Sequence, residues 1–162
     1  MELNAIAARA VAALKEQGLT VATAESCTGG MIAAALTDVA GASRVFGTGV
    51  VSYSWDCKRN LLGVSTVTLE TEGAVCAATA AQMAEGVRRV AAASVGVSVT
   101  GEAGPVVAEH HPVGTVFIGL ADEGGTMVEE HHFDGDRAAI RRQAAKAVLR
   151  LLIRRLEGVT AC

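Results

Sequence analysis

One short polar segment of the chain has residue types that can perform acyl transfer: residues 25–30, Glu-Ser-Cys-Thr-Gly-Gly. An alternating run over residues 19–24 predicts a strand before this segment, and the small residues from Met31 onward predict a helix after it. We expect Ser26 to be exposed at the sheet edge, beside backbone N–H groups that favour an anion. Ser26 is therefore the candidate nucleophile. The candidate oxyanion site is the backbone of Cys27, Thr28, Gly29 and Gly30.

A serine nucleophile needs a base, and Lys58 is the first candidate. Only three of the fourteen Lys and Arg residues are lysines, and a partly desolvated lysine can lose its proton whereas an arginine cannot. A surface lysine on a short helix is the alternative. Tyr53, the only tyrosine, can orient Ser26 or relay a proton, or can be a core aromatic whose hydroxyl reaches the rim. Cys27 is a rival nucleophile, which we expect instead to be a small buried hydrophobic residue.

Two later segments are candidates for substrate binding. Residues 100–105, Thr-Gly-Glu-Ala-Gly-Pro, follow a predicted buried strand, where glycines let the backbone approach a ligand; an ordinary connection between strands is the alternative. Arginines in the first turns of the last predicted helix oppose the helix dipole, which indicates an anionic ligand, a partner carboxylate or a solvated face. The candidate substrate-binding residues are Thr100, Gly101, Ala103, Gly104, Arg137 and Arg141.

The remaining composition argues against several classes of protein. The four histidines form two adjacent pairs without zinc-site spacing, so no metal is expected. The net charge of −3, without a basic stripe, argues against a nucleic-acid partner. Apolar runs are well short of the roughly 18 residues of a membrane span, and residues 1–13 predict an amphipathic helix, not a secretory signal. The four cysteines lack a CxxC pair, which favours reduced thiols and a cytoplasmic location.

Helices and strands alternate along the chain in the way needed to position these residues. The pattern predicts helices over about 3–17, 31–37, 56–62, 77–92 and 136–156. It predicts strands over about 20–24, 44–53, 95–100, 114–121 and 126–133, the last two forming a hairpin. With 3% aromatic residues, the core should consist of small side chains between closely packed elements. We expect the α/β class: a single three-layer α/β/α domain over 1–162 with a mixed, mainly parallel sheet and a late antiparallel hairpin.

Several short motifs follow one another in order along nearly the whole chain. They are Ala24–Gly30, Val51-x-Tyr53-Ser54 with Lys58, Gly73–Cys76, Val99–Pro105, Pro112–Val116 and Phe133–Arg137. Together they resemble the CinA C-terminal domain family, whose active members are nicotinamide-nucleotide amidases. The resemblance implies hydrolysis of the carboxamide of nicotinamide mononucleotide to nicotinate mononucleotide and ammonia. It matches the family's nucleophile to Ser26 and its Tyr and Lys to Tyr53 and Lys58, implies no metal or organic cofactor, and makes a homo-oligomer expected.

The chain departs from the family pattern at a few positions. Trp55 stands where the family has Asn, and Cys76 stands at a helix cap where Ser is usual. In the loop after Pro105, Val and Ala replace glycines over residues 106–108, and Glu102 replaces an apolar residue. If this loop holds the phosphate, Glu102 is expected to repel it. Two alternatives follow: a catalytically impaired member that binds a nucleotide or protein partner without hydrolysis, and an amidase for another small amide.

Overall fold

The computed structural model describes residues 1–158. The helices are α1 (Leu3–Gln17), α2 (Met31–Thr37), the 3-10 turn η1 (Ala42–Arg44), α3 (Trp55–Leu62), α4 (Thr66–Glu72), α5 (Ala77–Ala91) and α6 (Arg137–Leu156). The strands are β1 (Val21–Glu25), β2 (Phe46–Val51), β3 (Val95–Gly101), β4 (Thr115–Asp122) and β5 (Gly125–His132).

The five strands form one mixed sheet in the order β2-β1-β3-β4-β5. β1 runs parallel to both β2 and β3, and Val21 and Glu25 of β1 pair with Val95 and Val99 of β3. β4 and β5 continue the sheet as an antiparallel hairpin. The chain leaves β1 toward β2 and later returns to β3 on the other side of β1. This reversal opens a crevice at the carboxyl ends of β1 and β3, where open α/β sheets bind ligands.

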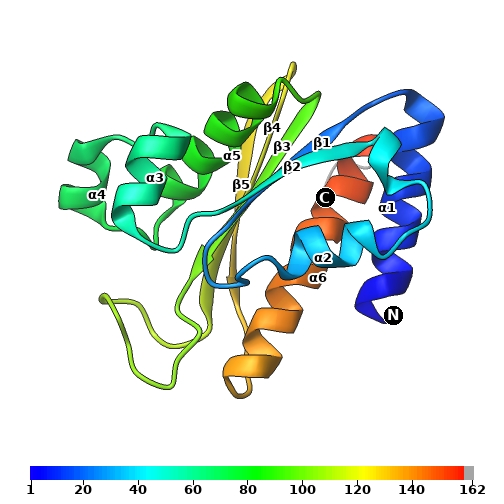
Figure 1. Ribbon diagram of the computed structural model, residues 1–162. Coiled ribbons are helices and arrows are strands. Elements are labelled where there is room, and N and C mark those ends of the chain that lie inside the picture. The colour runs from blue at the N-terminus through cyan, green and yellow to red at the C-terminus, as the bar shows by residue number, and fades with distance from the viewer. Residues whose placement is uncertain (159–162) are drawn as a thin grey trace.

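Helices cover both faces of the sheet (Figure 1). α1, α2 and α6 pack together on one face, and α5, with α3 and α4 beside it, packs on the other. This arrangement confirms the expected α/β/α layers and mixed sheet. At one end of the sheet, the turn after β1, the start of α6 and the long β3–β4 loop come together.

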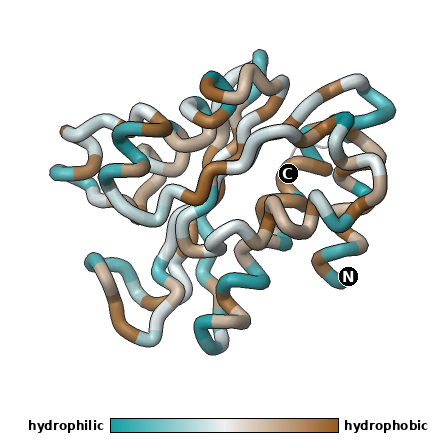
Figure 2. Tube along the Cα trace, viewed as in Figure 1, coloured by the Kyte–Doolittle hydropathy of each residue, from teal (hydrophilic) through white to brown (hydrophobic). Residues whose placement is uncertain are grey.

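Small residues let the layers approach closely. A Cβ at Gly86 would overlap the carbonyl oxygen of Leu62, and one at Gly119 would lie 2.7 Å from the carbonyl oxygen of Ala80. Along the Cα trace, hydrophobic residues concentrate in the strands and the inner faces of the helices, and hydrophilic residues mark helix ends and turns (Figure 2). The outer end of the β3–β4 loop is an exception, because Val106 and Val107 are exposed there.

The predicted elements all occur, with bounds shifted by a few residues at most. The sequence prediction missed α4, whose residues Thr66, Val67 and Thr68 are β-branched and weak helix formers. Its start was nevertheless marked by Ser65, which caps the helix through its hydroxyl. Among residues 1–158, no helix is long and apolar enough to cross a membrane. Cys27, Cys57 and Cys76 are free thiols, and Cys162 lies outside the described residues.

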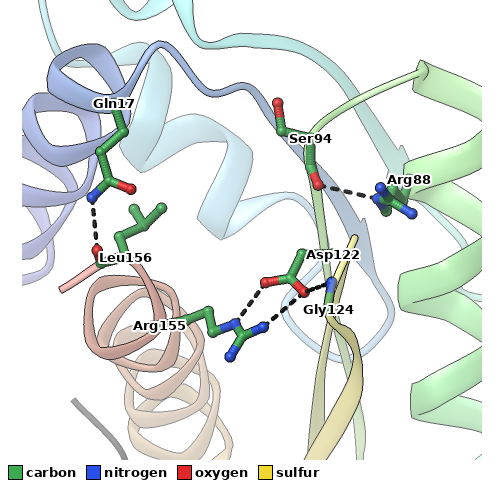
Figure 3. Close-up of polar contacts among 7 residues, drawn as sticks. All are labelled: Gln17, Arg88, Ser94, Asp122, Gly124, Arg155 and Leu156. Carbon is green, nitrogen blue, oxygen red and sulfur yellow. Dashed lines mark hydrogen bonds and ion pairs between the residues drawn. The ribbon is translucent and has the colours of Figure 1, made fainter. Parts of the chain in front are cut away.

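Polar contacts tie the other end of the sheet together (Figure 3). Arg155 of α6 grips the carboxylate of Asp122 with two hydrogen bonds of 2.6 and 3.0 Å, and the N–H of Gly124 donates to the same carboxylate. Gln17 donates to the Leu156 carbonyl, which joins the ends of α1 and α6. At this end of the sheet, the Arg155 guanidinium is paired with the Asp122 carboxylate, and Arg88 donates to the Ser94 carbonyl.

Candidate active site

Ser26 is the first residue after β1, and backbone hydrogen bonds fix its position between two neighbouring segments. Its N–H donates to the Val99 carbonyl at 3.0 Å, while the Glu25 carbonyl accepts from the N–H of Ser52 at 2.8 Å. The expectation that Ser26 is exposed is wrong: only 8% of its surface is accessible. Ser26 lines a cavity, and a substrate reaches its hydroxyl through that cavity.

Lys58 of α3 reaches the Ser26 hydroxyl. Its Nζ lies 2.8 Å from Ser26 Oγ, 2.6 Å from the Ser52 carbonyl oxygen and 3.5 Å from the Tyr53 carbonyl oxygen. Ser54 caps α3 by accepting the N–H of Cys57, which fixes the start of the helix at Trp55. The lysine is 1% exposed, so the surface-lysine alternative is wrong.

The environment of Lys58 favours the neutral amine. Among residues 1–158, no carboxylate forms an ion pair with it. Burial penalises the ammonium form and lowers the pKa of Lys58 from 10.5 to about 8, although the charge of Glu109 acts in the opposite direction. A lysine with this pKa is partly deprotonated near neutral pH, which a general base requires.

The N-terminus of α2 is already occupied by a side chain of the protein. The Glu25 carboxylate accepts the N–H groups of Ile32 and Ala33 at 2.8 and 3.0 Å, and the Thr28 hydroxyl donates to it at 2.7 Å. Thr28, Gly29 and Gly30 do not line the cavity. Glu25 therefore occupies the N–H groups of Ile32 and Ala33 at the helix start, which lie beyond the predicted oxyanion set. Of that set, Cys27 alone lies at the cavity wall.

Cys27 is buried, as expected for a small hydrophobic residue. Burial raises the pKa of its thiol to about 12, so the thiolate that a cysteine nucleophile needs is scarce. Arg141 donates through Nε and Nη2 to the carbonyl oxygens of Cys27 and Thr28 at 2.9 and 3.1 Å. Arg141 thus stabilises the turn through these two carbonyls and does not line the cavity. The prediction that it binds substrate is not supported by this placement.

Tyr53 lies beside the cavity but does not face Ser26 with its hydroxyl. Arg137 at the start of α6 donates to the Tyr53 hydroxyl at 3.0 Å and to the Gly104 carbonyl at 2.7 Å. Tyr53 is 62% exposed, so it is neither a core aromatic nor a bridge between Ser26 and Lys58. Its backbone carbonyl, rather than its phenol, contacts the lysine.

The carboxylates of Glu102 and Glu109 hold the β3–β4 loop in place beside the cavity through hydrogen bonds to backbone N–H groups. Buried Glu102 accepts the N–H groups of Ala108 and Glu109, both at 2.9 Å. The Glu109 carboxylate in turn accepts the N–H groups of Ala74 and Val75 at 2.7 and 3.0 Å, just before α5. Glu102 is therefore turned into the loop's own backbone, where it organises the loop.

A cavity of about 190 Å³ joins these elements. Its walls include the Ser26–Lys58 pair, the aromatic residues 53 and 55, the strand end 100–104 and Arg137. Thr100 donates its hydroxyl to the Ala74 carbonyl, so this side chain supports the wall. Among residues 1–158, the N–H groups of Ala103 and Gly104 have no hydrogen-bond partner, and both residues line the cavity.

Sequence reasoning missed several groups that shape the site. The Ser52 and Tyr53 carbonyls that hold the lysine are backbone atoms and have no signature in the side chains. The role of Glu25 as an internal helix cap had a signal, because it is the acidic residue before the helix, but the pattern did not show that it would turn toward α2. Among the described residues, no group of three or more His, Cys, Asp or Glu residues can hold a metal ion.

The family model of the CinA C-terminal domain matches residues 3–156. The chain belongs to the CinA C-terminal domain family. It is 48% identical over 143 residues to a CinA-like protein of Geobacter sulfurreducens, covering 88% of this chain and 35% of that protein. The chain spans about a third of the length of the curated relatives it matches.

Solved structures of the family have the same fold. A CinA superfamily protein from Klebsiella pneumoniae 700603 superposes with a TM-score of 0.95 at 34% identity, over 98% of this chain and 99% of that one. The competence/damage inducible protein CihA from Agrobacterium tumefaciens gives a TM-score of 0.91 at 41% identity, over 97% and 96% of the two chains. The fold and family are thereby shown, and the activity of the site is argued from its own geometry.

Proposed function

We propose that this domain is an amidohydrolase in which Ser26 is the nucleophile and Lys58 the general base, and that its substrate is nicotinamide mononucleotide. The observation that carries the proposal is the 2.8 Å contact between Lys58 Nζ and Ser26 Oγ in a buried setting without an ion-pair partner for the lysine among residues 1–158. A buried amine with a hydroxyl as its neighbour is an arrangement that activates a serine.

The hydrogen bonds of Lys58 suit a proton acceptor. The ammonium form has three donors, for the Ser52 carbonyl, the Tyr53 carbonyl and the Ser26 hydroxyl. A neutral amine keeps two donors for the two carbonyls, and its lone pair then faces Ser26. The Ser26 O–H can donate to that lone pair, so the carbonyls orient the amine in the state that accepts the proton.

The reaction proceeds as acyl transfer in two halves. Ser26 Oγ attacks the carboxamide carbon as its proton moves to Lys58, and the proton then passes to the departing nitrogen, which leaves as ammonia. Water attacks the acyl-serine ester, Lys58 takes a proton from it, and the carboxylate product leaves as Ser26 regains its proton. Because the Tyr53 hydroxyl is bonded to Arg137, Lys58 alone carries these protons.

Features around the pair support a mononucleotide as the substrate. Arg137 supplies a cation at the cavity wall, and the unpartnered N–H groups of Ala103 and Gly104 lie beside it. An arginine and backbone N–H groups are the usual ligands of a phosphate. The family resemblance of the sequence motifs implies the same substrate. No cofactor has a role in this reaction, and we propose a cytoplasmic homo-oligomer as the working form.

A second candidate function is binding without hydrolysis. Its support is Glu109, whose carboxylate occupies the N–H groups of Ala74 and Val75 at the cavity edge. If a substrate needs those N–H groups, the loop must first release them. A small amide other than the mononucleotide is a third candidate, and it fits the limited size of the cavity.

Ammonia release from nicotinamide mononucleotide tests the proposal. Wild type should release ammonia, and Ser26→Ala and Lys58→Met should each reduce the rate by about 10³-fold or more. Methionine keeps the length of the lysine side chain and removes only the amine. Equal rates of ammonia release in all three proteins would contradict the serine mechanism. Calorimetry with the same ligand identifies binding without turnover, and a panel of amides identifies another substrate.

A further inference from the structure

Trp55 is a large aromatic side chain left partly in water at the cavity wall. It is the only tryptophan of the chain, it is 43% exposed, and it lines the cavity together with Tyr53. The core of this protein is built almost entirely from aliphatic side chains. Two of its few aromatic rings are instead at the mouth of one cavity, where an apolar ring gains most if a ligand covers it.

The position of Trp55 on α3 places its ring near the reacting group. It is the first residue of the helix, and Lys58 follows three residues later, so both side chains lie on the same face. Lys58 contacts Ser26, and both residues line the same cavity as Trp55. A substrate whose amide carbon meets Ser26 must therefore place the atoms next to that amide against the wall of this cavity.

The size of the cavity selects the part of the ligand that is enclosed. At about 190 Å³, it is smaller than the roughly 300–1,000 Å³ of sites that bury a whole ligand. One ring with its carboxamide is the fragment that such a cavity encloses, and the remainder of a nucleotide must extend past the wall toward Arg137. Glu102 and Glu109 also line the cavity. Their carboxylates are bonded to backbone N–H groups, and their negative charges favour a positive charge in the enclosed fragment.

We propose that Trp55 is a specificity-determining residue whose indole stacks on the ring bearing the scissile amide and favours a ring that carries a positive charge. This inference rests on the proposed function, because it takes the amide to lie at Ser26. The face of an indole is electron-rich and attracts a cation more strongly than the other aromatic side chains do. A pyridinium ring is therefore preferred over a neutral ring of the same size.

The oxidised and reduced forms of nicotinamide mononucleotide are matched probes, because the ring is cationic in one and neutral in the other. Calorimetry in a Ser26→Ala background removes turnover. We expect the oxidised form to bind about 3- to 30-fold more tightly than the reduced form. Adding Trp55→Asn should remove most of that preference, and Trp55→Phe should retain part of it. Leu61→Asn is the control, since Leu61 is an exposed residue of α3 outside the cavity wall.

Fluorescence supplies a second readout that needs no substitution at Trp55. Because the chain has one tryptophan, all indole emission of the Ser26→Ala protein comes from this residue. Saturation with the oxidised form should quench the emission, and the midpoint should equal the calorimetric Kd. This arm tests the contact even if Trp55→Asn fails to fold.

The outcomes separate this inference from the proposed function. Unchanged affinities in Trp55→Asn, or emission that does not respond to bound ligand, would overturn the stacking role even if wild type releases ammonia. The expected binding pattern without ammonia release from wild type would overturn the amidase and leave the stacking role standing. Failure of the Ser26→Ala protein to bind either form would overturn both.

Discussion

At the carboxyl ends of β1 and β3, the Lys58 amine meets two carbonyls and a hydroxyl, whereas at the opposite end of the sheet Arg155 meets the carboxylate of Asp122 (Figure 3). The more deeply buried cation is the one that has no counter-ion among residues 1–158: Lys58 is 1% exposed, while the Arg155 side chain is 41% exposed. A counter-ion stabilises the charged form and fixes its protonation. The Lys58 environment instead destabilises the charge, which makes its proton transferable.

The largest expected difference between the two ends is in activity. Lys58→Met should lower ammonia release by about 10³-fold or more, because Ser26 then has no base. Arg155→Met removes the charge of another long cationic side chain, at the opposite end of the sheet. It should leave the rate of ammonia release unchanged. Steady-state kinetics on both variants checks this, and comparable losses in the two proteins would mean that the amine at the site has no special role.

The next effect is on stability, and it has an unusual sign. The lowering of the Lys58 pKa from 10.5 to about 8 corresponds to a cost of about 3 kcal/mol for keeping the ammonium form in the folded protein. Lys58→Met removes this cost but also leaves the Ser52 carbonyl without its hydrogen bond from Lys58. The free energy of unfolding at pH 7 should therefore rise by at most about 3 kcal/mol. Urea unfolding measures the change.

The pH dependence of that stability gain follows from the same linkage. Below pH 8 both folded and unfolded chains hold the proton, so the whole cost is present. Between pH 8 and 10.5 the unfolded chain binds more protons, and wild-type stability rises with pH. The advantage of Lys58→Met should shrink across this window. A stability difference between the two proteins that stays constant from pH 8 to 10.5 would contradict the account of a buried charge.

Substitution of Arg155 should change the free energy of unfolding less than substitution of Lys58 does, and should lower it. Arg155→Met removes the ion pair with Asp122, and partly exposed pairs of this kind contribute about 0.2–1 kcal/mol. The hydrogen bonds of Arg155 hold the pKa of Asp122 below its usual value. The contribution is thus present at neutral pH and is lost as the pH falls through the acidic range. Urea unfolding at pH 7 and pH 3 should show a loss at the first pH that shrinks at the second.

The smallest expected effect concerns Glu109, which links the loop to the site. Its charge raises the pKa of Lys58, against the larger effect of burial. Glu109→Gln keeps an oxygen for the Ala74 or Val75 N–H and removes the charge. The midpoint of the pH–rate profile should move to lower pH. A midpoint that moves upward would show that the carboxylate acts on the lysine in another way.

The sequence predicted the parts of this structure that depend on side-chain pattern. The bounds of α1 and α2 follow from apolar periodicity and from Gly18, which ends α1 in the left-handed conformation. Lys58 was predicted to be the base because lysine can lose its proton, and because lysine is rare in a chain that otherwise uses arginine. The 2.8 Å contact between Lys58 Nζ and Ser26 Oγ joins residues 32 positions apart, and a linear pattern does not show it.

The parts that were predicted incorrectly depend on partners that a linear pattern does not show. Ser26 is buried among neighbours from other parts of the chain, including Lys58 and Val99. Glu102, which was expected to repel a phosphate, instead accepts two backbone N–H groups of its own loop. Glu25 accepts the N–H groups of Ile32 and Ala33 at the start of α2, next to the residues expected to bind an oxyanion. Arg141 donates to the carbonyl oxygens of Cys27 and Thr28. From the sequence alone, its position in the first turns of α6 was equally compatible with binding an anionic ligand.

The most direct test of the central claim is an NMR titration of the lysine side chains. The chain has three lysines, so ¹³Cε-labelled lysine gives three signals, and the one absent from Lys58→Met belongs to Lys58. The account predicts that this signal titrates with a pKa of about 8 and that ammonia release rises with pH through the same midpoint. A Lys58 pKa near 10.5, together with a rate of ammonia release that does not change with pH around 8, would contradict the claim that a buried lysine activates Ser26.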